Sequence, residues 1–101
     1  MPDRILFDWD PAKASANRLK HGVTFQQAMD VFADPLALSV VDRTAPAGEE
    51  RWITIGTAGS AGLLLVVHTH EDRDETTIAI RIISARRPTR NERKHYEDEP
   101  A

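Results

Sequence analysis

The chain is most informative over residues 80–94, which read Ile-Arg-Ile-Ile-Ser-Ala-Arg-Arg-Pro-Thr-Arg-Asn-Glu-Arg-Lys. The isoleucine-rich first part predicts a strand, and the Pro-Thr break followed by a charged segment predicts a helix. Arg81 lies in the middle of that strand, where burial without a partner would be costly. Because guanidinium groups bind phosphate oxygens bidentately, the arginines at this strand exit suit a phosphodiester as well as an ion pair.

The composition indicates one globular domain over residues 1–101, with 41% hydrophobic and 29% charged residues. The absence of cysteine excludes disulfides and thiolate metal sites. The longest apolar run, residues 63–67, is too short to cross a membrane, and residues 1–4 lack a signal-peptide apolar region. We therefore expect no membrane association and a cytoplasmic location. The net charge of −3 argues weakly against a general nucleic-acid coating protein.

Two helices are expected near the N-terminus, after a short strand over residues 5–9. Asp10 as N-cap, Pro11 at the first helical position and Gly22 beyond the end predict a helix over residues 11–21, mostly exposed. Thr24 and Gln27 form a capping box for a second helix, which ends at Asp34-Pro35.

The apolar period then changes to two, which predicts strands. They are expected over residues 36–41, 51–56, 63–70 and 76–85, joined by a polar loop (42–50), a Gly-rich hairpin loop (57–62) and an acidic loop (71–75). Short turns between successive strands favour an antiparallel meander, and a last helix is expected over residues 88–97. The prediction is an α+β fold with two N-terminal helices, an antiparallel sheet of about four strands plus the short N-terminal strand, and a C-terminal helix.

Several motifs, in this order along the chain, resemble those of the BrnT family. They are Phe7-Asp8-Trp9-Asp10-Pro11-x-Lys13, Asn17-x-x-Lys20-His21-Gly22-Val23-x-Phe25, Ala28 through Phe32, Asp34-Pro35, Glu49-Glu50-Arg51, Ile53-Thr54-Ile55-Gly56, Val66-Val67-His68-Thr69 and Arg81-Ile82-Ile83-Ser84-Ala85-Arg86. The resemblance extends from Phe7 to Tyr96. It implies a RelE-like fold and a ribonuclease toxin of a type II toxin–antitoxin module that arrests translation.

The resemblance also implies partners. A BrnA-type antitoxin with a ribbon-helix-helix DNA-binding domain would neutralise the toxin, and the complex would repress its own operon by binding operator DNA. Toxin and antitoxin dimers forming a heterotetramer, two copies of each, would match the family. No cofactor is expected.

RNA can be cut without a metal, because its 2′-OH can attack the adjacent phosphate. The reaction needs a base, a group that stabilises the phosphorane-like charge, and an acid for the leaving oxygen. Arg81 is the best candidate for phosphate clamping, since Ile78, Ile80 and Ile82 take the other strand face. The alternative for Arg81 is a structural ion pair with Glu49, Glu50 or another acid.

His68 is a candidate general acid or base, because the pKa of histidine lies near neutrality. The alternative is a histidine hydrogen-bonded within the sheet. The base could instead be Glu50, or a group of the ribosome-bound RNA environment. Arg51 could hold phosphate or pair with the neighbouring acids, and Arg86 at the strand exit could also reach a phosphate.

Candidate RNA-binding residues lie at the strand exit and on two helices. They are Arg87, the helical stripe Arg90, Arg93 and Lys94, and Lys20 at the end of the first helix. The stripe could track an RNA backbone, receive an acidic antitoxin, or face solvent. A cation at Lys20 also suits the helix dipole. Tyr96 could donate a hydroxyl to phosphate and Trp9 could stack on a base, although packing explains both.

Two alternative functions belong to other classes of protein. A non-catalytic module would bind the antitoxin and act only in the repressor complex. The pair His68-x-His70 has a spacing that zinc sites use, but no third ligand stands out, so no metal is predicted.

Overall fold

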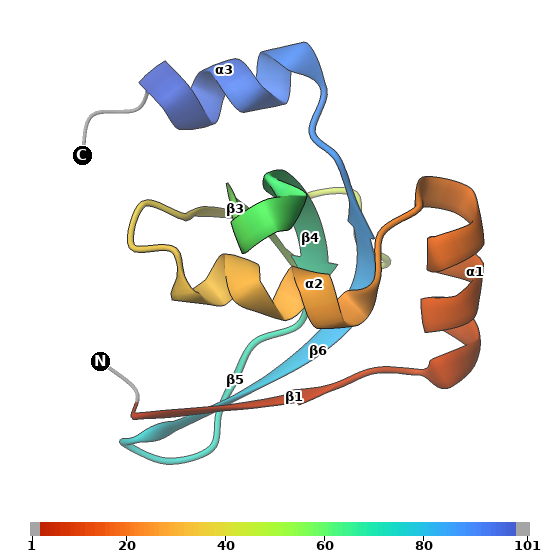
Figure 1. The fold of residues 1–101 in the computed structure, drawn as a ribbon. Coiled ribbons are helices and arrows are strands. Elements are labelled where there is room, and N and C mark those ends of the chain that lie inside the picture. Colours follow the sequence, from red (N-terminus) through yellow and green to blue (C-terminus); the bar gives the residue numbers. More distant parts are fainter. Residues whose placement is uncertain (1–2, 99–101) are drawn as a thin grey trace.

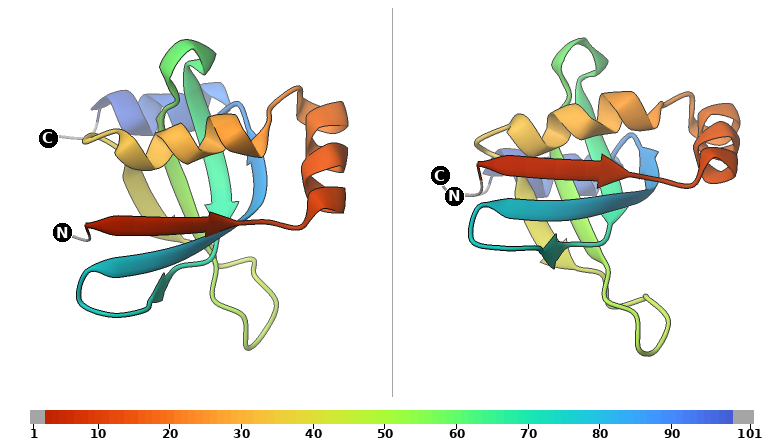
Figure 2. Two further views of the ribbon diagram at one scale, coloured as in Figure 1. Left: turned by 60° about the horizontal axis from the view of Figure 1, so that its bottom comes forward. Right: turned by 90° about the horizontal axis from the view of Figure 1, so that it is seen from below.

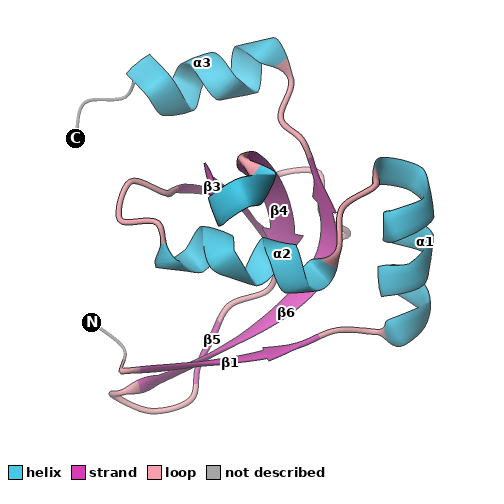
Figure 3. Cartoon of the chain, viewed as in Figure 1, coloured by secondary structure: helices cyan, strands magenta, loops and turns pink. Residues whose placement is uncertain are grey.

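The strands form one mixed sheet, with helices on both of its faces (Figures 1 and 3). The computed structural model describes residues 3–98, so the two ends of the expected domain, residues 1–2 and 99–101, lie outside the described residues. In chain order the elements are β1 (Arg4–Asp8), α1 (Pro11–His21), α2 (Phe25–Met29), the 3₁₀ helix η1 (Asp30–Ala33), β2 (Leu38–Val41), β3 (Trp52–Thr57), the 3₁₀ helix η2 (Gly59–Ala61), β4 (Leu63–His68), β5 (Glu71–Asp72), β6 (Thr77–Arg86) and α3 (Arg90–Asp98). The predicted α+β class is confirmed.

The sheet has the strand order β1-β6-β4-β3-β2, and β5 also pairs with β6. The strands β2, β3, β4 and β6 form the expected antiparallel meander. The short N-terminal strand β1 instead runs parallel to β6, with Asp8 opposite Arg81. Figure 2 shows these two strands side by side, although they come from opposite ends of the chain.

Local sequence signals set the helix ends. The Asp10 side chain accepts a hydrogen bond from the Ala12 N–H, and Gly22 ends α1 in the left-handed conformation at φ 68°. The capping box of Thr24 and Gln27 is present at the start of α2. A second capping box begins α3, because the Thr89 N–H donates to Glu92 Oε1 and the Glu92 N–H donates to Thr89 Oγ1.

Some predicted boundaries were wrong. The segment 36–37 belongs to a turn rather than to β2, because the Asp34 carboxylate accepts the Leu36 N–H and the Asp34 carbonyl accepts the Ala37 N–H. The strand β4 ends at His68 instead of residue 70. Part of the expected acidic loop 71–75 is the short strand β5, which pairs with β6.

The core lies between the sheet and the layer formed by α2 and η1. Phe25, Ala28 and Val31 from that layer are fully buried, and so are strand residues such as Leu64 and Val66. The packing is tight at Gly56 on β3, where an added Cβ would lie 3.1 Å from a backbone oxygen of η1. The helix α3 covers the opposite face, with α2 and α3 on either side of the strands (Figure 2).

The helix α1 packs beside the end of β6 and is mostly exposed, as predicted, but one residue was misjudged. Asn17 is only 7% exposed. Its side-chain amide donates to the carbonyls of Val23 and Ala85 at 3.1 and 2.8 Å, and its carbonyl accepts the Ala85 N–H at 3.0 Å. This side chain therefore replaces a missing strand partner at the end of β6.

Candidate functional site

A β-bulge in β6 decides which arginines share a face of the sheet. Val67 lies opposite Ser84, but the next residue, His68, lies opposite Ile82, so β6 contains one extra residue. As a result Ile80, Ile82 and Ala85 all belong to the core. Strict alternation would place Arg81 and Arg86 on opposite faces. With the bulge, both side chains lie on the face of the sheet that α3 covers.

Arg81 is an exposed side chain paired with a carboxylate from the neighbouring strand. Its Nη1 donates to Asp8 Oδ2 at 2.8 Å, and the two side chains are 49% and 68% exposed. The ion pair with an acid, which the sequence left open as the alternative for Arg81, is present, and its partner is Asp8 rather than Glu49 or Glu50. Within residues 3–98 Arg81 has no other side-chain hydrogen bond, so most of its donors face solvent.

Arg51 lies at the same end of the sheet as Arg81. Trp52, His68 and Ile82 lie side by side on three neighbouring strands. Arg51 precedes Trp52 and Arg81 precedes Ile82, so the two arginines lie at the same level of the sheet. The two backbones are separated by two strand spacings, about 10 Å. The Arg51 Nε donates to Glu49 at 2.9 Å, and its side chain remains 24% exposed. Glu50 accepts a hydrogen bond from the Trp52 indole at 3.2 Å.

His68 lies on the core face of β4 and is only 3% exposed. Its Nδ1 lies 2.9 Å from the Thr69 carbonyl oxygen and its Nε2 lies 2.7 Å from Thr54 Oγ1. The ring also meets Phe32 edge-on at a centroid distance of 4.8 Å. Burial lowers the pKa of His68, so the neutral ring is favoured. This environment matches the alternative prediction for His68, a histidine hydrogen-bonded within the sheet. The buried ring has no direct access to a bound RNA.

Arg86 is engaged in the attachment of α3. Its two terminal nitrogens donate to the two Glu92 oxygens at 2.8 and 2.9 Å. The Arg86 hydrogen bonds lower the pKa of Glu92 to about 2, and the same pair raises the pKa of Arg86. Because of the bulge, Arg81 and Arg86 are separated by about four strand steps, roughly 13 Å along the sheet. Both terminal nitrogens of Arg86 are bonded to Glu92, so in this arrangement Arg86 is not available to bind the same phosphate as Arg81.

The other predicted RNA-binding residues are spread over two regions. Arg87 donates to the Ala61 carbonyl at 2.6 Å and is exposed. Three further cations, Arg90, Arg93 and Lys94, are exposed on α3. Lys20 is exposed in the last turn of α1. The structure thus leaves these cations accessible but does not gather them around Arg81.

Tyr96 holds the far end of α3. Its hydroxyl donates to Asp34 Oδ2 at 2.6 Å, and this hydrogen bond raises the pKa of Tyr96. Burial pushes the pKa of Asp34 upward, but hydrogen bonds from Tyr96, Thr57 and Leu36 outweigh it and lower that pKa. Trp9 packs edge-on against Phe25, with ring centroids 5.8 Å apart.

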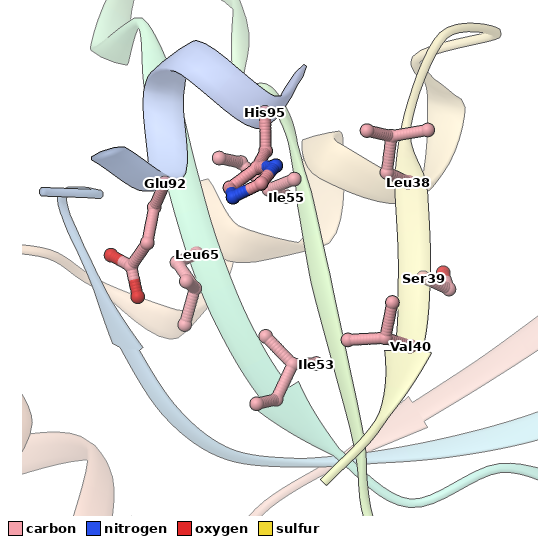
Figure 4. A pocket seen from close by; sticks show the side chains of 8 residues that line it. All are labelled: Leu38, Ser39, Val40, Ile53, Ile55, Leu65, Glu92 and His95. Carbon is pink, nitrogen blue, oxygen red and sulfur yellow. The ribbon is translucent and has the colours of Figure 1, made fainter. Parts of the chain in front are cut away.

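A cavity of about 500 Å³ lies between α3 and the sheet (Figure 4). Its lining is mainly apolar, formed by Leu38, Val40, Ile53, Ile55 and Leu65, with Glu92 and His95 contributed by α3. This lining contains no arginine, and Glu92 is already paired. The cavity therefore does not suit a phosphate, and we locate the candidate site at Arg81 and Asp8 instead.

The histidine pair at positions 68 and 70 does not form a metal centre. His68 is buried, whereas His70 lies at the surface and contacts Asp72 at 3.1 Å. Across residues 3–98 there is no group of three potential side-chain ligands for a metal ion. Among the described helices, none is long and apolar enough to cross a membrane.

Sequence reasoning missed two residues next to Arg81. Asp8 belongs to β1, and the only signal for its role was that an arginine in the middle of a strand calls for a carboxylate partner. Thr69 follows β4, and its hydroxyl accepts the Arg81 N–H at 3.2 Å. Neither contact is visible in the local sequence, because Asp8 and Arg81 are 73 positions apart.

Comparison with solved structures finds a chain with the same fold. The chain is similar to the crystal structure described as the Brucella abortus ribonuclease toxin, BrnT, with a TM-score of 0.52 and 21% identity. The match covers 86% of this chain and 97% of that chain, and at this identity it shows a shared fold.

The sequence pattern of the family described as "Ribonuclease toxin, BrnT, of type II toxin-antitoxin system" matches residues 9–92. The chain therefore belongs to the BrnT family, and the resemblance inferred from its motifs is confirmed. Membership implies an RNA target and an antitoxin partner. A comparison with curated proteins finds no match.

Proposed function

We propose that this chain is a metal-independent endoribonuclease whose reaction takes place beside Arg81 and Asp8. The observation that carries the proposal is the exposed guanidinium of Arg81 held 2.8 Å from the Asp8 carboxylate. An arginine suits the charge of a phosphorane-like transition state, and a neighbouring carboxylate suits proton removal. Because the RNA supplies its own nucleophile, this chemistry requires no metal.

In the proposed reaction the RNA 2′-OH attacks the adjacent phosphorus atom. The proton of that hydroxyl passes to the Asp8 carboxylate while the P–O5′ bond breaks. The products are a 2′,3′-cyclic phosphate and a 5′-OH end, the latter protonated from water or from the base that has just taken a proton. Arg81 binds the non-bridging oxygens, and its free nitrogens can do so without releasing Asp8.

The surrounding cations would bind the RNA on either side of the scissile phosphate. Arg51 lies within about two strand spacings of Arg81 and can reach a neighbouring phosphate. Lys20, Arg87 and the α3 cations lie further away, where they can contact the extended RNA backbone. His68 is buried and Glu50 is hydrogen-bonded to Trp52, whereas the Asp8 carboxylate lies directly beside Arg81, so Asp8 is the better placed base.

RNA cleavage by this protein would arrest translation in the cytoplasm. The proposed inhibitor is a BrnA-type antitoxin, which would cover the toxin in a complex containing two copies of each chain. Through its ribbon-helix-helix domain, the antitoxin would bring that complex to the operator DNA. Family membership supports a toxin–antitoxin pair, and purification of the complex with its neighbouring gene product would establish the antitoxin type and stoichiometry.

The proposal predicts that Arg81→Ala and Asp8→Asn each lower the RNA cleavage rate by about 10²- to 10⁴-fold, since each removes a group that acts in the transition state. The measurement is growth after induction of each variant alone, together with primer extension on total RNA. Arg73→Ala is the matched control, because Arg73 is also an exposed arginine paired with a carboxylate, Glu71, at 2.8 Å.

New RNA 5′ ends and growth arrest in the native protein and in Arg73→Ala, but not in Arg81→Ala, would support the proposal. Full cleavage by a folded Arg81→Ala protein would contradict it. If the native protein is folded and produces neither arrest nor new RNA ends, the non-catalytic antitoxin-binding function becomes the better account.

A further inference from the structure

We propose that His68 and Thr69 are positioning residues that aim Arg81 at its phosphate. This inference rests on the proposed function of Arg81 as the phosphate-binding group. It concerns the point where β4 ends and where β6 carries its bulge, which are the same place in the fold. Bulges next to functional sites commonly redirect a side chain.

The backbone pairing at Thr69 and Arg81 departs from a regular ladder. In an antiparallel hydrogen-bonded pair, two residues exchange both N–H···O=C bonds. Here the Thr69 N–H donates to the Arg81 carbonyl at 3.0 Å, but the Arg81 N–H donates to the Thr69 hydroxyl at 3.2 Å. A side-chain oxygen therefore stands in for the backbone carbonyl.

The Thr69 carbonyl is instead hydrogen-bonded to the side chain of His68. The Thr69 carbonyl oxygen can only accept, and it lies 2.9 Å from His68 Nδ1, so Nδ1 must carry the proton. Nε2 of the neutral ring is then an acceptor, and it receives the hydroxyl proton of Thr54 at 2.7 Å. The Thr54 oxygen in turn lies 2.7 Å from the Ser39 hydroxyl.

The histidine ring is thus fixed on both sides, and it holds the Thr69 carbonyl away from β6. With Phe32 packed on its edge, the ring cannot swing without opening the core. The Thr69 hydroxyl is left to hold the Arg81 backbone at the bulge. Alternation with Ile80 and Ile82 sets the face on which Arg81 lies. His68 and Thr69 fix the Arg81 backbone directly beside the bulge, and so control the direction in which the guanidinium extends.

The test compares Thr69→Val with Thr69→Ser. Valine has a similar shape but cannot accept the Arg81 N–H, whereas serine keeps the hydroxyl. We expect Thr69→Val to lower kcat about 10- to 100-fold with little change in KM, because a displaced arginine is lost mainly from the transition state. Thr69→Ser should recover most of the rate. Urea unfolding and circular dichroism at the assay temperature check that all variants are folded.

The double variant with Arg81→Ala separates positioning from a general structural effect. If Thr69 acts through Arg81, Thr69→Val causes no further loss of the residual rate in the Arg81→Ala background. An equal loss in both backgrounds would overturn the inference, as would a native rate for folded Thr69→Val. A native rate for Arg81→Ala itself would instead contradict the proposed function.

His68 provides a second, independent comparison. In His68→Asn the amide nitrogen can stand near Nδ1 and donate to the Thr69 carbonyl, whereas His68→Gln places its amide nearer Nε2. We expect His68→Asn to retain at least about tenfold more activity than His68→Gln when both are folded. Equal activity in the two folded variants would contradict the role assigned to Nδ1.

Discussion

At the scale of single residues, polar side chains make hydrogen bonds to backbone groups that a neighbouring strand would otherwise make. Asn17 satisfies both the N–H and the carbonyl of Ala85 at the end of β6. The Thr69 hydroxyl accepts the N–H of Arg81 at the bulge. Both sets of hydrogen bonds are made to the backbone of β6, the strand that carries the proposed phosphate-binding residue. The position of this strand therefore depends on a few individual side chains.

Asn17→Ala should lower the free energy of unfolding by about 2–4 kcal/mol, because it leaves buried donors and acceptors without partners. The urea midpoint measures the effect. The control is Asn91→Ala on exposed α3, which we expect to change the unfolding free energy by no more than about 0.5 kcal/mol. A native midpoint for Asn17→Ala would contradict the role of this side chain as a strand partner.

At the scale of elements, α3 is attached to the sheet by its two ends rather than by burial. None of its residues is buried. Arg86 holds Glu92 near the first turn, and Asp34 accepts the hydroxyl of Tyr96 near the last turns. An apolar cavity remains beneath the helix. The attachment of α3 therefore depends on polar contacts, and one of these is an ion pair whose strength depends on pH.

The pKa of Glu92 is about 2 in the folded protein, against an ordinary value of 4.5. Because the folded-state pKa is depressed, the stabilisation is present above pH 4.5 and is lost as the pH falls toward 2. After allowance for solvent screening of this partly exposed pair, we expect a loss of about 1 kcal/mol over that range. Urea unfolding at a series of pH values measures it.

Glu92→Gln is the matched variant for this prediction, since glutamine can keep the capping box with Thr89 but not the ion pair. Its free energy of unfolding should be lower than that of the native protein at pH 7, and the gap should close by pH 2. Parallel pH profiles for the two proteins would show that the Arg86–Glu92 pair contributes nothing to stability.

At the scale of the whole molecule, cations are concentrated in one region although the net charge is negative. The formal net charge is −3, yet the end of β6, the residue after it and α3 together carry five of the cations, Arg86, Arg87, Arg90, Arg93 and Lys94. The acids of residues 71–75 lie around β5, at the other end of β6. RNA would therefore be attracted by a local surface while the molecule as a whole repels it.

Replacement of Arg90, Arg93 and Lys94 by alanine should weaken RNA binding and reduce the slope of log Kd against log salt by up to about 2, if each cation contacts a phosphate. The control removes Arg4, Arg43 and Arg73, which are also exposed. Both triple variants change the formal net charge from −3 to −6. Equal salt slopes for the two variants would show that α3 does not contact RNA.

What the amino-acid sequence determined by itself is the set of local structures. Asp10 and Thr24 each cap the helix that was predicted from them, because a cap needs only residues two or three positions away. The four-stranded meander was also predictable, since short turns leave successive strands few other ways to pair. The face of Arg81 away from the core was anticipated from the alternation of isoleucines around it.

Only the tertiary structure decided how the site is assembled. The parallel pairing of β1 with β6 brings Asp8 to Arg81 across 73 positions, and no local signal encodes that contact. Likewise, alternation alone predicts that Arg81 and Arg86 lie on opposite faces of the sheet, whereas the bulge in β6 places both on the same face. His68 was a candidate acid or base by residue type, but its ring is buried and packs against Phe32 of η1. Local sequence sets where a strand begins and ends, whereas burial and long-range pairing depend on which surfaces meet when the whole chain folds.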